Sequence, residues 1–118
     1  MEIDNLRNPT IILNVSGCTW LEFDSWTCSG SHTADNGNGY TYKAHSYIKE
    51  YNYATSTAGN TLTTEEGYET KLAVSENKTS LSNQKINVEG IDYVQISSFC
   101  AVGNTVFGTI NITGIKGY

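Results

Sequence analysis

The chain has 118 residues, of which 38 % are hydrophobic, and this size suits one domain with a single two-layer core. Only 16 % of the residues are charged, and the formal net charge is −5. Binding to nucleic acid requires a concentration of Lys and Arg, whereas the seven basic residues here are scattered among twelve acidic ones, which argues against nucleic acid as a partner. No apolar run reaches the roughly 20 residues that cross a bilayer, which argues against membrane insertion.

The first predicted strand follows the single proline, Pro9. Residues 1–9 lack the apolar segment of a signal peptide, and we expect them to be a flexible leader. The whole chain, residues 1–118, is expected to form one domain. Residues 10–15 are a β-branched run that ends at Ser16–Gly17, which predicts a strand.

Residues 18–26 alternate as a half-buried strand does. One face has Leu21 and Phe23. The other face has four larger or charged side chains: Trp20, Glu22, Asp24 and Trp26. If Leu21 and Phe23 form the core, both tryptophans point outward at least in part, and an outward tryptophan indicates a function. The alternative is that this second face is also covered, by the 29–39 loop or by a subunit interface.

The middle of the chain alternates loops with strands. Residues 29–39 contain almost every turn-forming residue type and predict a long loop, whereas residues 40–49 alternate and predict a strand with Ala44, Ser46 and Ile48 on one face. Residues 52–64 form a polar stretch with its turn at Gly59–Asn60. A single helical turn is expected only at 63–68, before a strand at 68–74 and a polar connection at 75–84.

The last third is the most strand-like part. Strands are predicted at 85–88, 93–100 and 105–115, with Ile110 and Ile112 on one face and a bulge at Gly108. The whole pattern favours an all-β fold, a two-sheet antiparallel β-sandwich of jelly-roll-like type with about seven or eight strands and little helix.

Two parts of this pattern resemble a known group of modules. A strand passes through residues 14–19 into Leu21-Glu22-Phe23, and later residues 86–97 are followed by a closing strand at 110–115. This arrangement, over about half the chain, resembles the β-sandwich modules of phage tail and fibre proteins and of surface proteins of gut bacteria. The resemblance implies a domain that attaches to a glycan or to a neighbouring virion protein. It implies no particular site residue, because these modules share no fixed site motif.

Three cysteines, Cys18, Cys28 and Cys100, leave at least one thiol outside any pair within the chain. A bond between Cys18 and Cys28 would need a hairpin near residues 24–25, so Cys18 with Cys100 is the better pair if a disulfide exists, and three half-buried thiols are the alternative. Residues 35–39 offer the oxygens of Asp35, Asn36 and Asn38 for calcium. The later bidentate acid is missing, which favours an ordinary turn and no cofactor.

The sequence does not favour an enzyme. Glu22 and Asp24 are spaced like a pair of glycosidase carboxylates, but alternating acids on a strand are usually a solvated face. The same holds for the second acidic group, Glu65, Glu66 and Glu69. His32 and His45 have no nucleophile motif beside them.

Binding is the favoured function, because aromatic and amide side chains gather in the first half of the chain. Flat aromatic rings can pack on the apolar faces of sugar rings while amides and carboxylates read the hydroxyl groups. The chain offers Tyr51, Asn52 and Tyr53 in addition to eight candidate ligand-binding residues. These eight are Trp20, Trp26, Asp35, Asn36, Asn38, Tyr40, Tyr42 and Tyr47.

We therefore expect a non-catalytic recognition module that binds cell-surface carbohydrate, as a receptor-binding or adhesin domain at a virion or extracellular surface. The first alternative is a structural domain of a virion fibre or surface assembly, a homo-oligomer such as a trimer in which the same aromatic side chains are buried between chains. The second alternative is a small glycan-degrading enzyme that uses Glu22 and Asp24.

Overall fold

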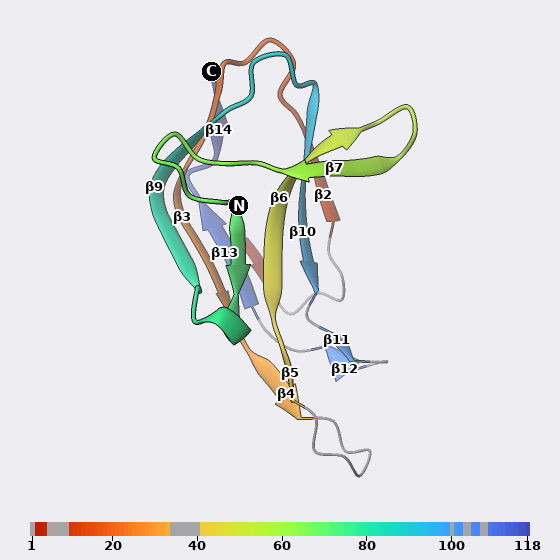
Figure 1. The fold of residues 1–118 in the computed structure, drawn as a ribbon, viewed down its shortest axis with the longest axis vertical. Helices are drawn as coiled ribbons and strands as arrows, with labels where there is room; N and C mark the ends of the chain where they lie inside the picture. Colours follow the sequence, from red (N-terminus) through yellow and green to blue (C-terminus); the bar gives the residue numbers. More distant parts are fainter. Residues whose placement is uncertain (1, 5–9, 34–40, 100, 103–104, 107–108) are drawn as a thin grey trace.

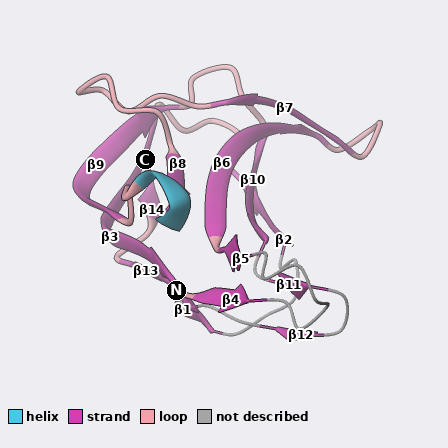
Figure 2. Cartoon of the chain, turned by 60° about the horizontal axis from the view of Figure 1, so that its bottom comes forward, coloured by secondary structure: helices cyan, strands magenta, loops and turns pink. Residues whose placement is uncertain are grey.

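The computed structural model describes residues 2–4, 10–33, 41–99, 101–102, 105–106 and 109–118, which build two facing antiparallel sheets (Figures 1 and 2). The predicted antiparallel β-sandwich is therefore confirmed. Over these residues the only helical element is one 3₁₀ turn, η1 (Val74–Glu76). None of the described residues belongs to a helix with the length and hydropathy of a membrane span.

The two layers are named here after their central strands, β3 and β6. The β3 sheet contains β1 (Glu2–Asp4), β13 (Thr109–Thr113), β3 (Trp20–Ser29), β14 (Lys116–Gly117) and β9 (Ser80–Asn87). The β6 sheet contains β2 (Thr10–Asn14), β10 (Tyr93–Phe99), β6 (His45–Asn52), β7 (Thr57–Thr61) and β8 (Lys71–Ala73). Two small hairpins lie at the lower end of Figure 1: β4 (Ser31–Thr33) with β5 (Thr41–Lys43), and β11 (Ala101–Val102) with β12 (Thr105–Val106).

The core lies between the two sheets and follows the predicted alternation over most of its length. Leu21 and Phe23 of β3 are buried, and so are Ala44 beside β6 and Ser46 and Ile48 within it. The opposite sheet face and the ends of the sandwich complete one cluster of buried apolar side chains. It also includes Val15, Trp26, Cys28, Leu62, Leu72, Ile86, Val88, Val94, Ile96, Ile110 and Ile112.

The alternation changes phase once, at the same level in three neighbouring segments. In β3 the buried positions run through Phe23 and then resume at Trp26. In β9 Leu81 packs on the core and the next inward residue is Gln84. After β13, Ile112 is followed by Ile115. Each segment takes a step of three residues instead of two, so the pairing register of β3 with both neighbours is preserved.

Two left-handed residues accompany this phase change in the segments on either side of β3. Asn83 and Gly114 have φ angles of 52° and 67°, and the strand registers place them on either side of Asp24. A backbone in this region turns the chain so that the next side chain points to the other face. The prediction that Trp26 faces outward is therefore wrong, because Trp26 is fully buried and packs edge-on against Phe23 at 6.0 Å.

Several local predictions are also corrected. Residues 2–4 of the expected flexible leader form β1, which pairs with β13. The strand expected at 68–74 is limited to β8, and the connection expected at 75–84 contains the first half of β9. The helical turn expected at 63–68 is instead a turn in which the Tyr68 amide donates to Thr64 Oγ1 at 3.0 Å.

Cys18 and Cys28 are separated by most of β3. Cys18 lies two residues before β3 begins and Cys28 lies near its end, so the hairpin near residues 24–25 that would join them does not form. Cys28 is buried in the core, and Cys18 forms no disulfide bond with another described residue. Cys100 and the bulge predicted at Gly108 lie outside the described residues.

Candidate functional site

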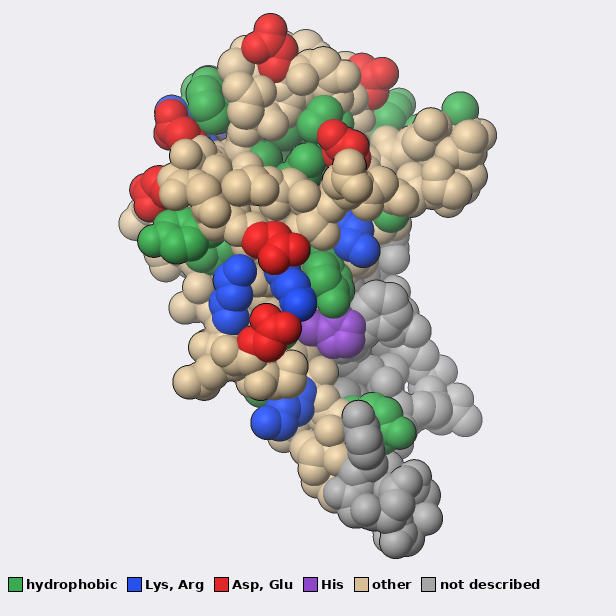
Figure 3. All heavy atoms as spheres, viewed as in Figure 1, with side chains coloured by type: hydrophobic (Ala, Val, Ile, Leu, Met, Phe, Trp, Pro, Cys, Tyr) green, Lys and Arg blue, Asp and Glu red, His purple; other side chains and the backbone are tan. Residues whose placement is uncertain are grey.

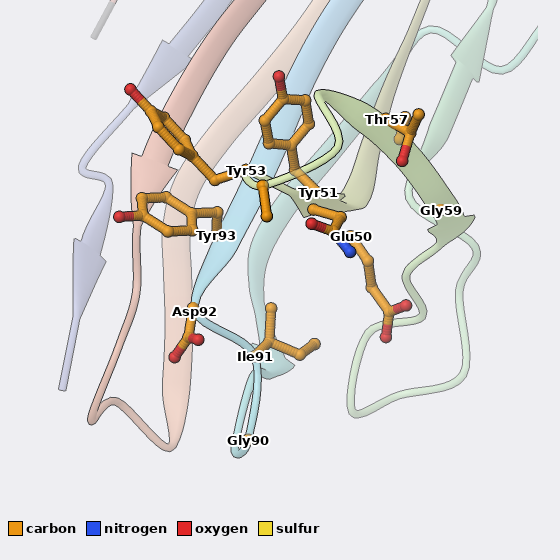
Figure 4. Close-up of a pocket in the computed structure, with 12 residues that line it drawn as sticks. Glu50, Tyr51, Tyr53, Thr57, Gly59, Gly90, Ile91, Asp92 and Tyr93 are labelled. Carbon is orange, nitrogen blue, oxygen red and sulfur yellow. The ribbon is translucent and has the colours of Figure 1, made fainter.

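An open hollow of about 780 Å³ lies at one end of the β6 sheet (Figure 4). It forms where the hairpin between β6 and β7 meets the turn that leads into β10. Its lining consists of Glu50, Tyr51, Asn52, Tyr53, Ala54, Thr57, Ala58, Gly59, Gly90, Ile91, Asp92 and Tyr93. Two segments about 40 residues apart in the sequence therefore supply this site.

Three tyrosines form the aromatic part of the hollow. The strand register places Tyr51 of β6 directly opposite Tyr93 of β10. Both lie on the outer face of the sheet. Side chains alternate along a strand, and the core face is occupied by Ile48, three residues before Tyr51, and by Val94, directly after Tyr93. Tyr53 follows in the hairpin turn, where its ring stacks on Tyr93 at 4.9 Å and 29° and meets Tyr51 edge-on at 6.3 Å. Tyr53 remains 64 % exposed.

A β-bulge positions Glu50 at the hollow. Lys49 pairs with Thr61 and Tyr51 with Ala58, so Gly59 and Asn60 together face the single residue Glu50. The predicted turn at Gly59–Asn60 is therefore wrong, because these residues lie within β7 and the turn covers residues 53–56. The Glu50 side chain lies across Gly59, where a Cβ would meet Glu50 Oε2 at 3.4 Å. Such bulges re-aim side chains at the ends of sheets.

The opposite wall is the tight turn before β10, which forms hydrogen bonds with the segment that follows β2. Gly90 has a φ of 81°, a conformation that glycine adopts without strain, and the Ile91 amide donates to the Val88 carbonyl at 2.9 Å. The Asp92 carbonyl accepts from the Val15 amide at 2.8 Å, and Asp92 Oδ1 accepts from Ser16 Oγ at 3.1 Å. The wall is thus held by several hydrogen bonds.

The eight residues predicted from the sequence are not brought together. Trp26 is buried and offers no surface to a ligand. Trp20 is half-exposed on the outer face of the β3 sheet, where Lys85 Nζ lies 4.3 Å from its ring centre. Tyr47 is on the outer face of the other sheet, between His45 at 5.4 Å and Lys49 Nζ at 4.7 Å. Tyr42 is exposed on β5, and Asp35, Asn36, Asn38 and Tyr40 lie outside the described residues.

Of the four predicted residues that the structure describes, Tyr47 shares a strand face with the hollow. It lies four residues before Tyr51 on β6, which corresponds to roughly 13 Å along the strand. Sequence reasoning had noted Tyr51, Asn52 and Tyr53 but missed Glu50, Ile91, Asp92 and Tyr93. The sequence feature that could have indicated them is the Glu89–Gly90 turn directly before a strand that begins with a tyrosine. This feature points to the site only when β10 is known to pair with β6.

The two acidic groups of the sequence do meet, at a smaller hollow of about 220 Å³ on the β3 sheet. Glu22 and Asp24 line it together with Glu65 and Glu66. Glu22 is already engaged, because Lys116 Nζ lies 3.0 Å from Oε1 and Tyr118 donates to Oε2 at 3.0 Å. These hydrogen bonds lower the pKa of Glu22, so the carboxylate stays ionised and is a poor proton donor. Among the described residues, no group of three or more His, Cys, Asp or Glu side chains is arranged so that it could hold a metal ion.

The chain matches no protein-family model, no curated protein and no solved structure. The geometry of the tyrosine-lined hollow and the chemistry of its walls are therefore the features that point to a function.

Proposed function

We propose that this domain is a non-catalytic recognition module that binds carbohydrate in the hollow lined by Tyr51, Tyr53 and Tyr93. The setting proposed for it is a virion or cell surface, as in a receptor-binding or adhesin domain. The weakly charged, Asn- and Thr-rich composition supports such a setting. The proposal moves the binding site away from Trp26 and the 29–39 loop to the end of the β6 sheet.

The observation that carries the proposal is the ring of Tyr53, which is 64 % open to solvent and stacks on Tyr93. Such stacking favours one orientation of the exposed ring. An aromatic surface fixed in advance loses little conformational entropy when a ligand packs on it. The apolar C–H face of a pyranose ring suits such a surface.

The polar groups around the rings supply the second part of sugar recognition. Asn52 provides amide donors and an acceptor, and Glu50 and Asp92 provide carboxylate acceptors. Sugar hydroxyl groups can donate to these carboxylates and accept from the amide. A few placed polar groups beside an aromatic surface are the usual composition of a small-molecule site.

The openness of the hollow supports binding rather than hydrolysis. A glycosidase needs one carboxyl group whose pKa is raised by an apolar enclosure, so that it can donate a proton. Here the Asp92 carboxylate is exposed and accepts a hydrogen bond from Ser16 Oγ, so it lacks such an apolar enclosure. We expect no shortening of any oligosaccharide that the domain binds.

A glycan array with the wild type, Tyr53→Ala and Tyr68→Ala tests the proposal. Tyr68 is a matched control, because it is also an exposed tyrosine, at 48 %, and does not line the hollow. The proposal predicts binding by the wild type and Tyr68→Ala, and a loss of at least about tenfold in Tyr53→Ala. Equal binding by both variants would move the site elsewhere. Absence of binding with a stable trimer in light scattering would favour the structural role.

A further inference from the structure

The walls of the tyrosine-lined hollow carry negative charge only. Glu50 and Asp92 lie on opposite sides of Ile91 in Figure 4, and no described lysine, arginine or histidine lines the hollow. On the face seen in Figure 3, most charged side chains in the upper part of the molecule are acidic, whereas acidic and basic side chains lie side by side at mid-height. A ligand in this hollow therefore meets a negative potential.

Three other partly exposed rings each have a lysine side chain over them. A lysine ammonium lies over Tyr47 at 4.7 Å, over Trp20 at 4.3 Å and over Tyr118 at 5.6 Å. Among the described residues, the stacked pair of Tyr53 and Tyr93 has no such cation. Within the described part of the chain, this stacked pair in the hollow with two carboxylates is therefore open to a cation from a ligand.

We infer that the ligand of this hollow bears an ammonium group, and that the site selects an amino sugar with a free amine over its N-acetylated or anionic counterparts. The inference depends on the proposed carbohydrate function and specifies its ligand class. An ammonium group can donate charge-assisted hydrogen bonds to Glu50 and to the free Oδ2 of Asp92. It is also attracted to the negative faces of the tyrosine rings.

The same charges act against the competing ligands. N-acetylation removes the positive charge and places a carbonyl oxygen where the walls offer acceptors. A uronic or sialic acid brings a carboxylate toward Glu50 and Asp92, and like-charge contact disfavours binding. Selectivity thus comes from repulsion as well as attraction.

Calorimetric titration with two β-1,4-linked tetramers, one of glucosamine and one of N-acetylglucosamine, tests the inference. At about pH 6 the free amine is protonated. We expect the glucosamine tetramer to bind about five- to tenfold more tightly, which is the size of one or two partly exposed charge and cation–π contacts. Raising the pH until the amine is neutral should remove the preference, and high salt should reduce it.

Glu50→Gln identifies the carboxylate responsible, with Glu69→Gln as its control. Both changes remove one negative charge, but exposed Glu69 lies outside the hollow. The preference for the free amine should fall at least about threefold in Glu50→Gln and remain in Glu69→Gln. A choline titration separates an amino sugar from a simple ammonium ligand, since choline lacks the pyranose ring.

The outcomes separate the two proposals. Equal affinity for both tetramers would overturn the ammonium inference and leave the carbohydrate function intact. Binding of choline without either tetramer would overturn the carbohydrate function and, with it, the amino-sugar ligand. Binding of neither tetramer nor choline would overturn both proposals. A preference that persists in Glu50→Gln would show that this carboxylate does not select the amine.

Discussion

Gly114→Ala tests the phase change that places Trp26 in the core. Gly114 has a φ of 67°, which costs alanine about 1–2 kcal/mol. The new Cβ would also collide with the Asp24 carboxylate, which overpacking data place at about 1–3 kcal/mol. Together these terms predict a loss of about 2–5 kcal/mol, a large part of the roughly 5–15 kcal/mol that stabilises a domain.

The assay is urea unfolding followed by tryptophan fluorescence, with Asp24→Ala as the background for a double-mutant cycle. Asp24→Ala removes the carboxylate from the collision but leaves a Cβ about 3.0 Å from the new methyl group. Gly114→Ala should therefore cost about 1–2 kcal/mol less in that background than in the wild type. A neutral Gly114→Ala, or an unchanged cost in the Asp24→Ala background, would refute this explanation of the phase change.

Three further changes test other parts of the structure. Trp26→Ala should lower the free energy of unfolding by about 3–5 kcal/mol in urea melts, because its ring is fully buried against Phe23; an unaltered melt would show an exposed ring. Hydrogen bonds from Lys116 and Tyr118 lower the pKa of Glu22 in the folded protein, so the ionised form stabilises the fold above the pKa of an unfolded glutamate, and this stabilisation is lost as the pH falls through the folded pKa. Lys116→Met should weaken that loss of stability in melts below about pH 5, and an unchanged acid limb would contradict the pairing. Thr70→Val should cost about 1 kcal/mol in urea melts, since Thr70 Oγ1 lies 2.8 Å from the carbonyl oxygens of both Ile48 and Leu62; a stabilised variant would contradict this.

Hydrophobic alternation was enough to predict the sandwich and much of its core. Ile48 on β6 and Ile110 and Ile112 on β13 are buried as their alternation indicates. In each of these stretches the strand is regular, so one inward residue fixes the direction of its neighbours. Such short-range periodicity is present in a single sequence.

The direction of Trp26 could not be predicted in the same way, because the phase change before it coincides with left-handed residues in β9 and between β13 and β14. Neither Asn83 nor Gly114 is near Asp24 in the sequence, and the register that aligns them is a property of the assembled sheet. Strict alternation along β3 alone predicts correctly that Leu21 and Phe23 face the core, but it places the next core residue, Trp26, on the wrong face. A phase change of this kind is visible only when three strands are compared.

The candidate site was only partly accessible to sequence reasoning for a similar reason. Tyr51 and Tyr53 were visible as aromatic residues, but Tyr93 joins them only through the pairing of β10 with β6. Gly59 has the composition of a turn, yet it serves in a bulge that holds Glu50 at the hollow. The aromatic content was therefore predictable, whereas its grouping was not.

The most direct test of the central claim is an amide chemical-shift titration of the wild-type domain with the glucosamine tetramer and the N-acetylglucosamine tetramer in parallel. The account predicts saturable shifts at the residues that line the hollow, in segments 50–54, 57–59 and 90–93, with at least one of the two tetramers. Shifts centred on Trp20 and Lys85 of the other sheet, or no shifts with either tetramer, would contradict it.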